Sequence, residues 1–267
     1  MPLTVQNILN IIEKIAPASL AEDWDNVGLM VGNSSASVDS ILIGLDPTLP
    51  LLDEAISMGA NLLITHHPFI FHPLKAVRLD RPVGIFVERA IQNRINVLSC
   101  HTNFDSAAKG VSFSLAQKLG LRDTEPLVAH SGNDLCGMGR IGIYREPVSA
   151  DEFIGKLRAA CSPPWVLATA NKPVEISCVA VCGGSCSELA PVALERGAQV
   201  FVTSEVKHST ARWAEQAGLW VVDGGHFATE NQALTIFAEN LEAEASRDSN
   251  AIQIYITRQQ ISPLLLV

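Results

Sequence analysis

Residues 55–65 read AISMGANLLIT and residues 193–203 read ALERGAQVFVT, and the architecture follows from their likeness. In each stretch a helix-like segment stops at a Gly-Ala pair, and an apolar strand follows that ends in threonine. Glycine suits the position just past a helix, because the backbone there takes a positive φ. The two stretches therefore predict that one helix–strand unit occurs twice in this chain.

Each copy extends in both directions along the chain. An apolar run precedes each copy, at residues 40–45 in the first and 176–181 in the second. A helix and a third strand follow each copy, and these strands lie at residues 95–101 and 219–226. Runs of Val, Ile and Leu that alternate with helices are typical of a parallel sheet covered on both faces. We expect an α/β fold with a strand–helix–strand–helix–strand unit in each half. The first copy carries a longer loop, at residues 68–82.

The segments outside the repeat also show patterns. A helix is expected at residues 1–17, and a hairpin near residues 140–144 with a helix at 151–161 opens the second half. A helix at 231–243 and a strand at 251–257 close the chain.

Composition and charge narrow the class of protein. Hydrophobic residues make up 48% and charged residues 18% of the 267-residue chain, as in compact globular proteins. The net charge of −9 argues against broad nucleic-acid binding and against attachment to an anionic membrane. Without a signal peptide or a long apolar span, the protein is expected in the cytoplasm.

Histidines and acids stand where the predicted strands end. His66 and His67 follow one strand, and His101 and His226 follow two others, each with an acid four positions later, Asp105 and Glu230. Ligands bind at the carboxyl ends of parallel strands, and imidazole with carboxylate is a donor set for divalent transition metals. Taken singly, His101 or His226 is more often a buried core residue, and the His66-His67 pair is about as often a polar turn. Each acid is more often a first-turn residue facing the helix dipole.

Taken together, these side chains favour a metal centre. The number of candidate ligands exceeds the four that one tetrahedral zinc takes. The candidates are His66, His67, Asp105, His226 and Glu230, with His101 close by. They suit two ions with open positions for water. Two other patterns are weaker: the Gly183-Gly184 loop is either a phosphate cradle or a plain tight turn, and the cysteines are expected as small buried side chains.

Five short motifs resemble one known family. They occupy residues 22–29 (EDWDNVGL), 64–68 (ITHHP), 101–105 (HTNFD), 182–185 (CGGS) and 225–230 (GHFATE). In this order they resemble the Nif-three-like dinuclear metal-centre proteins, often labelled GTP cyclohydrolase type 2 homologues, in their short bacterial form. Two departures stand at Thr203-Ser204-Glu205, where the family often has Thr-Gly-acid, and at His208, one position from the family's downstream histidine.

The resemblance implies a fold and a set of ligands. Two interlocked, pseudo-repeated α/β domains are expected, each a mostly parallel sheet flanked by helices, the first at residues 1–124 plus 226–267 and the second at 125–225. The implied metal site lies at their interface. Its ligands fall on His66, His67, Asp105, His226 and Glu230, and they hold two divalent ions of iron, zinc or manganese. The implied assembly is a toroidal homohexamer.

Two functions follow from this pattern. The first is a metal-dependent hydrolase of the GTP cyclohydrolase type, in which activated water attacks a nucleotide or related small molecule and His101 or Glu205 moves protons. The alternative is a non-enzymatic, metal-binding ring that acts as a scaffold or binds regulators.

Overall fold

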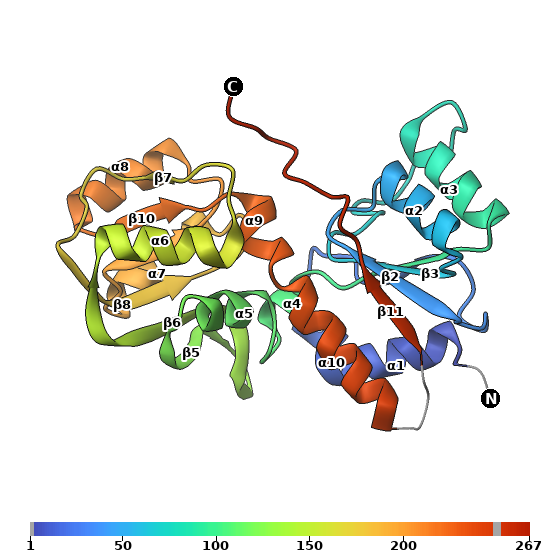
Figure 1. The fold of residues 1–267 in the computed structure, drawn as a ribbon, viewed down its shortest axis with the longest axis horizontal. Coiled ribbons are helices and arrows are strands. Elements are labelled where there is room, and N and C mark those ends of the chain that lie inside the picture. Colours follow the sequence, from blue (N-terminus) through green and yellow to red (C-terminus); the bar gives the residue numbers. More distant parts are fainter. Residues whose placement is uncertain (1–2, 248–251) are drawn as a thin grey trace. The chain divides into compact units, whose positions relative to one another are not determined.

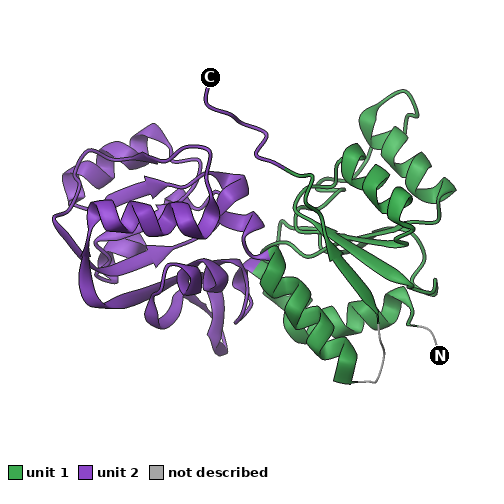
Figure 2. Ribbon diagram, viewed as in Figure 1, with its two compact units in different colours: residues 1–104, 234–260 green, residues 105–233, 261–267 purple. Residues whose placement is uncertain are grey.

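The computed structural model describes residues 3–247 and 252–267. The chain divides into two compact units (Figure 2), unit 1 with residues 1–104 and 234–260 and unit 2 with residues 105–233 and 261–267. The boundaries expected from the sequence lay after residues 124 and 225 instead. Helix α5 (Val111–Lys118) falls in unit 2 because its side chains Leu115 and Ala116 belong to a core cluster of that unit.

Unit 1 is built on a five-stranded sheet in the order β1-β4-β3-β2-β11 (Figure 1). The bounds are β1 (Gly28–Val31), β2 (Ser40–Gly44), β3 (Leu62–Thr65), β4 (Asn96–Ser99) and β11 (Gln253–Ile256). Strands β4, β3, β2 and β11 are parallel, and β1 is antiparallel to β4. The residues Met1, Pro2 and Ala251 of the expected terminal helix and strand lie outside the described part of the chain.

Helices cover both faces of this sheet (Figure 1). The helices α2 and α3 pack on one face and α1 and α10 on the other, with bounds α1 (Val5–Ile15), α2 (Leu49–Met58), α3 (Pro82–Gln92) and α10 (Leu234–Arg247). A capping box between Thr4 and Asn7 begins α1. Short helices η1 (Ala18–Leu20) and α4 (Thr102–Ser106) follow α1 and β4.

Unit 2 has a six-stranded sheet in the order β5-β6-β8-β9-β10-β7. The bounds are β5 (Arg122–His130), β6 (Asn133–Ser149), β7 (Leu167–Ala168), β8 (Glu175–Val181), β9 (Val200–Thr203) and β10 (Trp220–Asp223). Strands β8, β9 and β10 are parallel, whereas β5, β6 and β7 pair antiparallel to their neighbours. The β5–β6 pair is the hairpin that the sequence predicts.

The apolar side chains of unit 2 form two core clusters. One lies under α5 and α6 (Ala150–Cys161) and contains Phe153, Val200 and Val222. The other lies under α7 (Ala190–Glu195) and α8 (His208–Ala217) and contains Phe201 and Val221. Successive strand residues thus enter opposite clusters, as the alternation of a strand requires. The helices η2 (Ser187–Leu189) and α9 (His226–Asn231) complete the unit.

The repeat predicted from the sequence is confirmed. Strands β4-β3-β2 and β10-β9-β8 have the same order, and the glycines that stop the intervening helices, Gly59 and Gly197, have φ of 71° and 84°. Each copy of the repeat has one further strand that was not predicted from the sequence. In unit 1 the strand β1 pairs antiparallel with β4, and in unit 2 the strand β7 pairs antiparallel with β10. The long loop of the first copy joins β3 to α3.

Within residues 3–247 and 252–267, no helix is both long enough and apolar enough to span a membrane.

Candidate metal centre

Three histidines gather at the carboxyl edge of the sheet of unit 1. His66 and His67 follow β3 and His101 follows β4. One ring nitrogen of each lies within 4.8 Å of a ring nitrogen of the other two. The ring centroids are 5.1, 5.2 and 5.5 Å apart. The parallel sheet explains this cluster, because neighbouring strands bring their carboxyl ends to one edge.

The backbone of the adjacent pair is held by the sheet. The His66 N–H donates to the Gly44 carbonyl at 3.1 Å and the His67 N–H donates to the Leu45 carbonyl at 2.9 Å. The Ser99 hydroxyl donates to the His66 carbonyl at 3.0 Å. These bonds continue the β2–β3 ladder past its last strand residue, so both imidazoles start from a rigid backbone.

Each ring in this histidine cluster uses Nδ1 to contact an oxygen of the protein. The contacts are His66 to the Cys100 carbonyl at 3.0 Å, His67 to Asp46 Oδ1 at 2.7 Å, and His101 to Asp25 Oδ1 at 2.8 Å. A carbonyl only accepts, so His66 Nδ1 carries a proton, and in the neutral ring Nε2 carries the lone pair. Metal-binding histidines are oriented in this way, by an acceptor on the second ring nitrogen.

Asp25 is the best-defined of these acceptors. Its side chain is fully buried, and its carboxylate accepts from the Thr102 N–H at 3.0 Å and from the Thr102 hydroxyl as well as from His101. Burial by itself raises the pKa of this carboxyl, but the hydrogen bonds from His101 and Thr102 outweigh it and hold the pKa at about 2. Asp25 is therefore an anion that fixes the His101 ring.

Sequence reasoning missed Asp25 and Asp46 as site residues. Asp46 stands just past the end of β2, at the same edge as His66 and His101, so its position at a strand end was a usable signal. Asp25 lies within the motif at residues 22–29, but its contact with His101 spans 76 positions. Spacing along the chain does not reveal such a pair.

Unit 2 carries a second set of donors on α9 and the β9–α8 turn. His226 Nδ1 contacts Glu205 Oε1 at 2.8 Å, and His226 Nε2 lies 3.1 Å from Glu230 Oε2. Glu230 is buried one helical turn after His226, so both side chains share a face of α9. Glu205 has a φ of 53°, a conformation that costs a non-glycine residue energy and that clusters at functional sites.

The remaining expected ligand, Asp105, is buried in α4 at the first position of unit 2. The structure thus brings His66, His67 and His101 together in unit 1. In unit 2 it brings His226, Glu230 and Glu205 together.

The Gly183-Gly184 loop is a tight turn against α9. Its N–H groups donate to the hydroxyls of Ser112 and Thr229 at 3.4 and 3.1 Å, so they serve packing rather than a phosphate. The pKa of the Cys186 thiol after this loop is raised by its hydrogen bond with Cys182 and by burial, which makes it a poor nucleophile.

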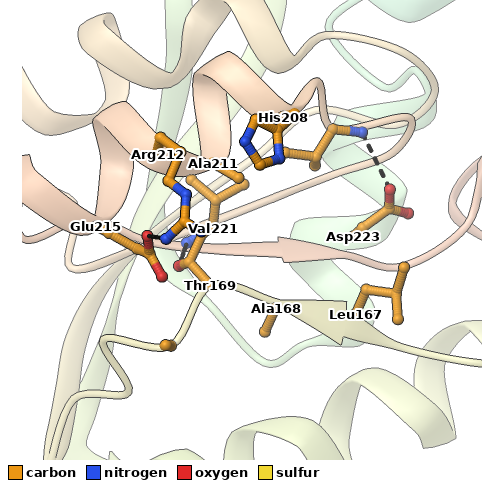
Figure 3. Close-up of a pocket in the computed structure, with 11 residues that line it drawn as sticks. Leu167, Ala168, Thr169, His208, Ala211, Arg212, Glu215, Val221 and Asp223 are labelled. Carbon is orange, nitrogen blue, oxygen red and sulfur yellow. Dashed lines mark hydrogen bonds and ion pairs between the residues drawn. The ribbon is translucent and has the colours of Figure 1, made fainter.

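A hollow of about 430 Å³ in unit 2 lies between α8 and the β7–β10 edge (Figure 3). His208 begins α8 and lines it. Among the charged residues that line the hollow, Arg212 pairs with Glu215 at 2.8 Å and Asp223 accepts the Val206 N–H at 3.1 Å.

Comparison with known sequences gives matches along almost the whole chain. A model of the Duf34/NIF3 family (NGG1p interacting factor 3) matches residues 3–263. A relative from Clostridium acetobutylicum, named GTP cyclohydrolase 1 type 2 homolog, is 31% identical over 265 residues, which are 98% of each chain. A Nostoc protein of the same name is 35% identical over 205 residues, 76% of this chain and 77% of its own.

Solved structures share the fold. The Bacillus cereus protein related to NIF3 superposes with a TM-score of 0.91 over 100% of both chains at 23% identity. Reduced HcgD from Methanocaldococcus jannaschii reaches a TM-score of 0.80 at 28% identity, over 96% of this chain and 98% of its own. The α/β fold expected from the sequence is confirmed.

Proposed function

Since the chain belongs to the Duf34/NIF3 family, we propose that it is a metal-dependent hydrolase of the GTP cyclohydrolase type. Two divalent cations, of iron, zinc or manganese, are bound by His66, His67, Asp105, His226 and Glu230. The observation that carries this proposal is the shared use of Nδ1. His66, His67 and His226 each engage an oxygen of the protein through Nδ1, which directs Nε2 to act as the ligand.

The donor chemistry fits such ions. Imidazole nitrogen and carboxylate oxygen together suit zinc, iron and manganese. His66 and Glu230 are both only 3% exposed, so their polar atoms are removed from bulk water. Burial of a carboxylate is costly unless it is paired or binds a cation. The His226 ring, whose Nε2 lies 3.1 Å from Glu230 Oε2, offsets part of that cost, and a bound cation would offset more.

Two residues of the chain, His101 and Glu205, are proposed to transfer protons. Divalent cations at such sites act as Lewis acids and lower the pKa of water. His101 accepts a proton at Nε2, and the resulting imidazolium is stabilised by Asp25, which stays ionised because its pKa is about 2. Glu205 is the second group proposed for proton transfer, and its contact with His226 gives it a positioning role as well.

The proposed substrate is a nucleotide, with GTP as the first candidate. One water adds at C8 and opens the imidazole ring of the purine to a formamide, and a second water cleaves the formamide, so that this carbon leaves as formate. The family name of the relatives supports this substrate, and so does the presence of imidazole and carboxylate groups for general acid–base chemistry.

The test is formate release from GTP by protein loaded with zinc, iron or manganese. We expect turnover by the wild type and loss of at least about 100-fold in His66→Ala and Glu230→Gln, since each removes a ligand. Equal release by the double variant contradicts the proposal. Inertness toward a broad panel of nucleotides and esters favours the alternative, a metal-binding scaffold.

We further propose that the protein is a cytoplasmic homohexamer, as the resemblance of the sequence implies. Light scattering coupled to size-exclusion chromatography measures the mass of the assembly directly. A monomer or dimer at micromolar concentration contradicts this part of the proposal without affecting the chemistry.

A further inference from the structure

Two aromatic side chains stand exposed beside the histidine cluster of unit 1. Trp24 is 57% and Phe71 39% exposed, and their ring centroids lie 5.7 Å apart. The His101 ring is 6.1 Å from Trp24 and 6.3 Å from Phe71. All three residues belong to unit 1. The exposed aromatic surface therefore adjoins the imidazole to which we assign proton transfer.

The backbone that carries Trp24 is anchored on both sides. The Asp25 N–H donates to the Glu22 carbonyl at 2.9 Å, which closes a turn around Trp24. The Glu22 N–H donates to the Thr102 hydroxyl at 3.0 Å, and the Asp25 side chain is buried against His101. The Asp25 side chain, next to Trp24, is thus buried, while the Trp24 indole faces solvent. A large apolar ring in that position loses the hydrophobic stabilisation that burial gives.

Phe71 is held by the same turn. The Asn26 side-chain amide donates to the Ile70 carbonyl at 2.6 Å, which ties the turn to the loop between β3 and α3. Phe71 also contacts the His72 ring, with centroids 4.7 Å apart. This loop is the segment that lengthens the first copy of the repeat. The corresponding β9–α8 connection of unit 2 spans only residues 204–207.

We infer that Trp24 and Phe71 form a stacking platform for a planar heteroaromatic ring of the substrate, such as a purine base. The inference rests on the proposed function, because it names the part of that substrate that these rings recognise. A flat ring on this platform gains contact with aromatic faces that are otherwise in water. It also lies beside His101, since both aromatic rings are within 6.3 Å of that imidazole. Trp24 and Phe71 are thus specificity-determining residues.

The test measures binding rather than turnover. Calorimetry with metal-loaded protein compares guanosine, which has the base and no phosphate, with inorganic triphosphate, which has no base. We expect Trp24→Ala to weaken guanosine binding roughly 5- to 150-fold, as loss of one stacking partner does. Trp24→Phe keeps a flat ring and should stay within about threefold of the wild type. The dissociation constant of triphosphate should not change.

Tyr255→Ala is the matched control. Tyr255 lies on β11 of unit 1 and is 39% exposed, like Phe71. Its removal should leave guanosine binding unchanged. If Trp24→Ala does not fold, Phe71→Ala tests the same platform from an exposed loop.

Several results overturn the inference. One is equal binding of guanosine by Trp24→Ala and the wild type, and another is a wild type that does not bind guanosine. Dissociation of the assembly by Trp24→Ala, seen by light scattering, identifies the rings as a subunit interface instead. A wild type that binds guanosine through Trp24 and releases no formate from GTP refutes the proposed hydrolysis and leaves the platform intact.

Discussion

At the scale of single residues, the Asp25–His101 contact predicts a stability that depends on pH. Asp25→Asn should lower the free energy of unfolding by about 1.5–3 kcal/mol at pH 7, because a buried carboxylate loses charge-assisted bonds from His101 and Thr102. The folded pKa of about 2 lies below the ordinary value near 3.8, so folding favours the ionised form. The stabilisation is therefore complete above about pH 4 and is lost as the pH falls toward 2.

Urea unfolding at pH 7, 4 and 3 measures this effect. The difference in the free energy of unfolding between the wild type and Asp25→Asn should become smaller only in the acid samples. Asp80→Asn is the control, since Asp80 forms an exposed ion pair with Arg78 and should change stability little. A gap that is constant from pH 7 to pH 3 contradicts this account of Asp25.

At the scale of elements, the β8–η2 turn holds the acid of α9 in place. Gly184 has a φ of 73°, and a Cβ added there would lie 2.1 Å from Glu230 Oε1. Gly184→Ala should therefore displace the Glu230 carboxylate and lower the metal content of purified protein. Gly197→Ala is the control, because Gly197 has a φ of 84° with no atom within 4 Å of the added Cβ. It should cost only about 1–2 kcal/mol of backbone strain. Elemental analysis that finds equal metal in both variants refutes the role of the turn.

At the scale of the whole molecule, the five ligands that we propose come from distant parts of the chain, from His66 to Glu230. Ligand binding stabilises the folded state by RT ln(1 + [L]/Kd), about 4 kcal/mol at a thousandfold excess over Kd. Chelation should then lower the Tm, and His66→Ala in unit 1 or Glu230→Gln in unit 2 should each remove most of the metal-dependent rise. The double variant should lose little more than either single one. Additive losses in calorimetric Tm would show two independent sites.

The local pattern of the chain was enough to predict the repeated strands and helices and the histidines at the strand ends. Apolar periodicity, the Gly-Ala stops and the position of a polar residue after a strand are properties of neighbouring residues, so they can be read directly. The edge strands β1 and β7 were missed, because both lie outside the strand–helix alternation of the repeat and β7 has only two residues, both exposed. Only the tertiary structure decided which acid orients which imidazole. Asp25 meets His101 across 76 positions and Asp46 meets His67 across 21, and such contacts arise when packing closes long loops around a sheet edge.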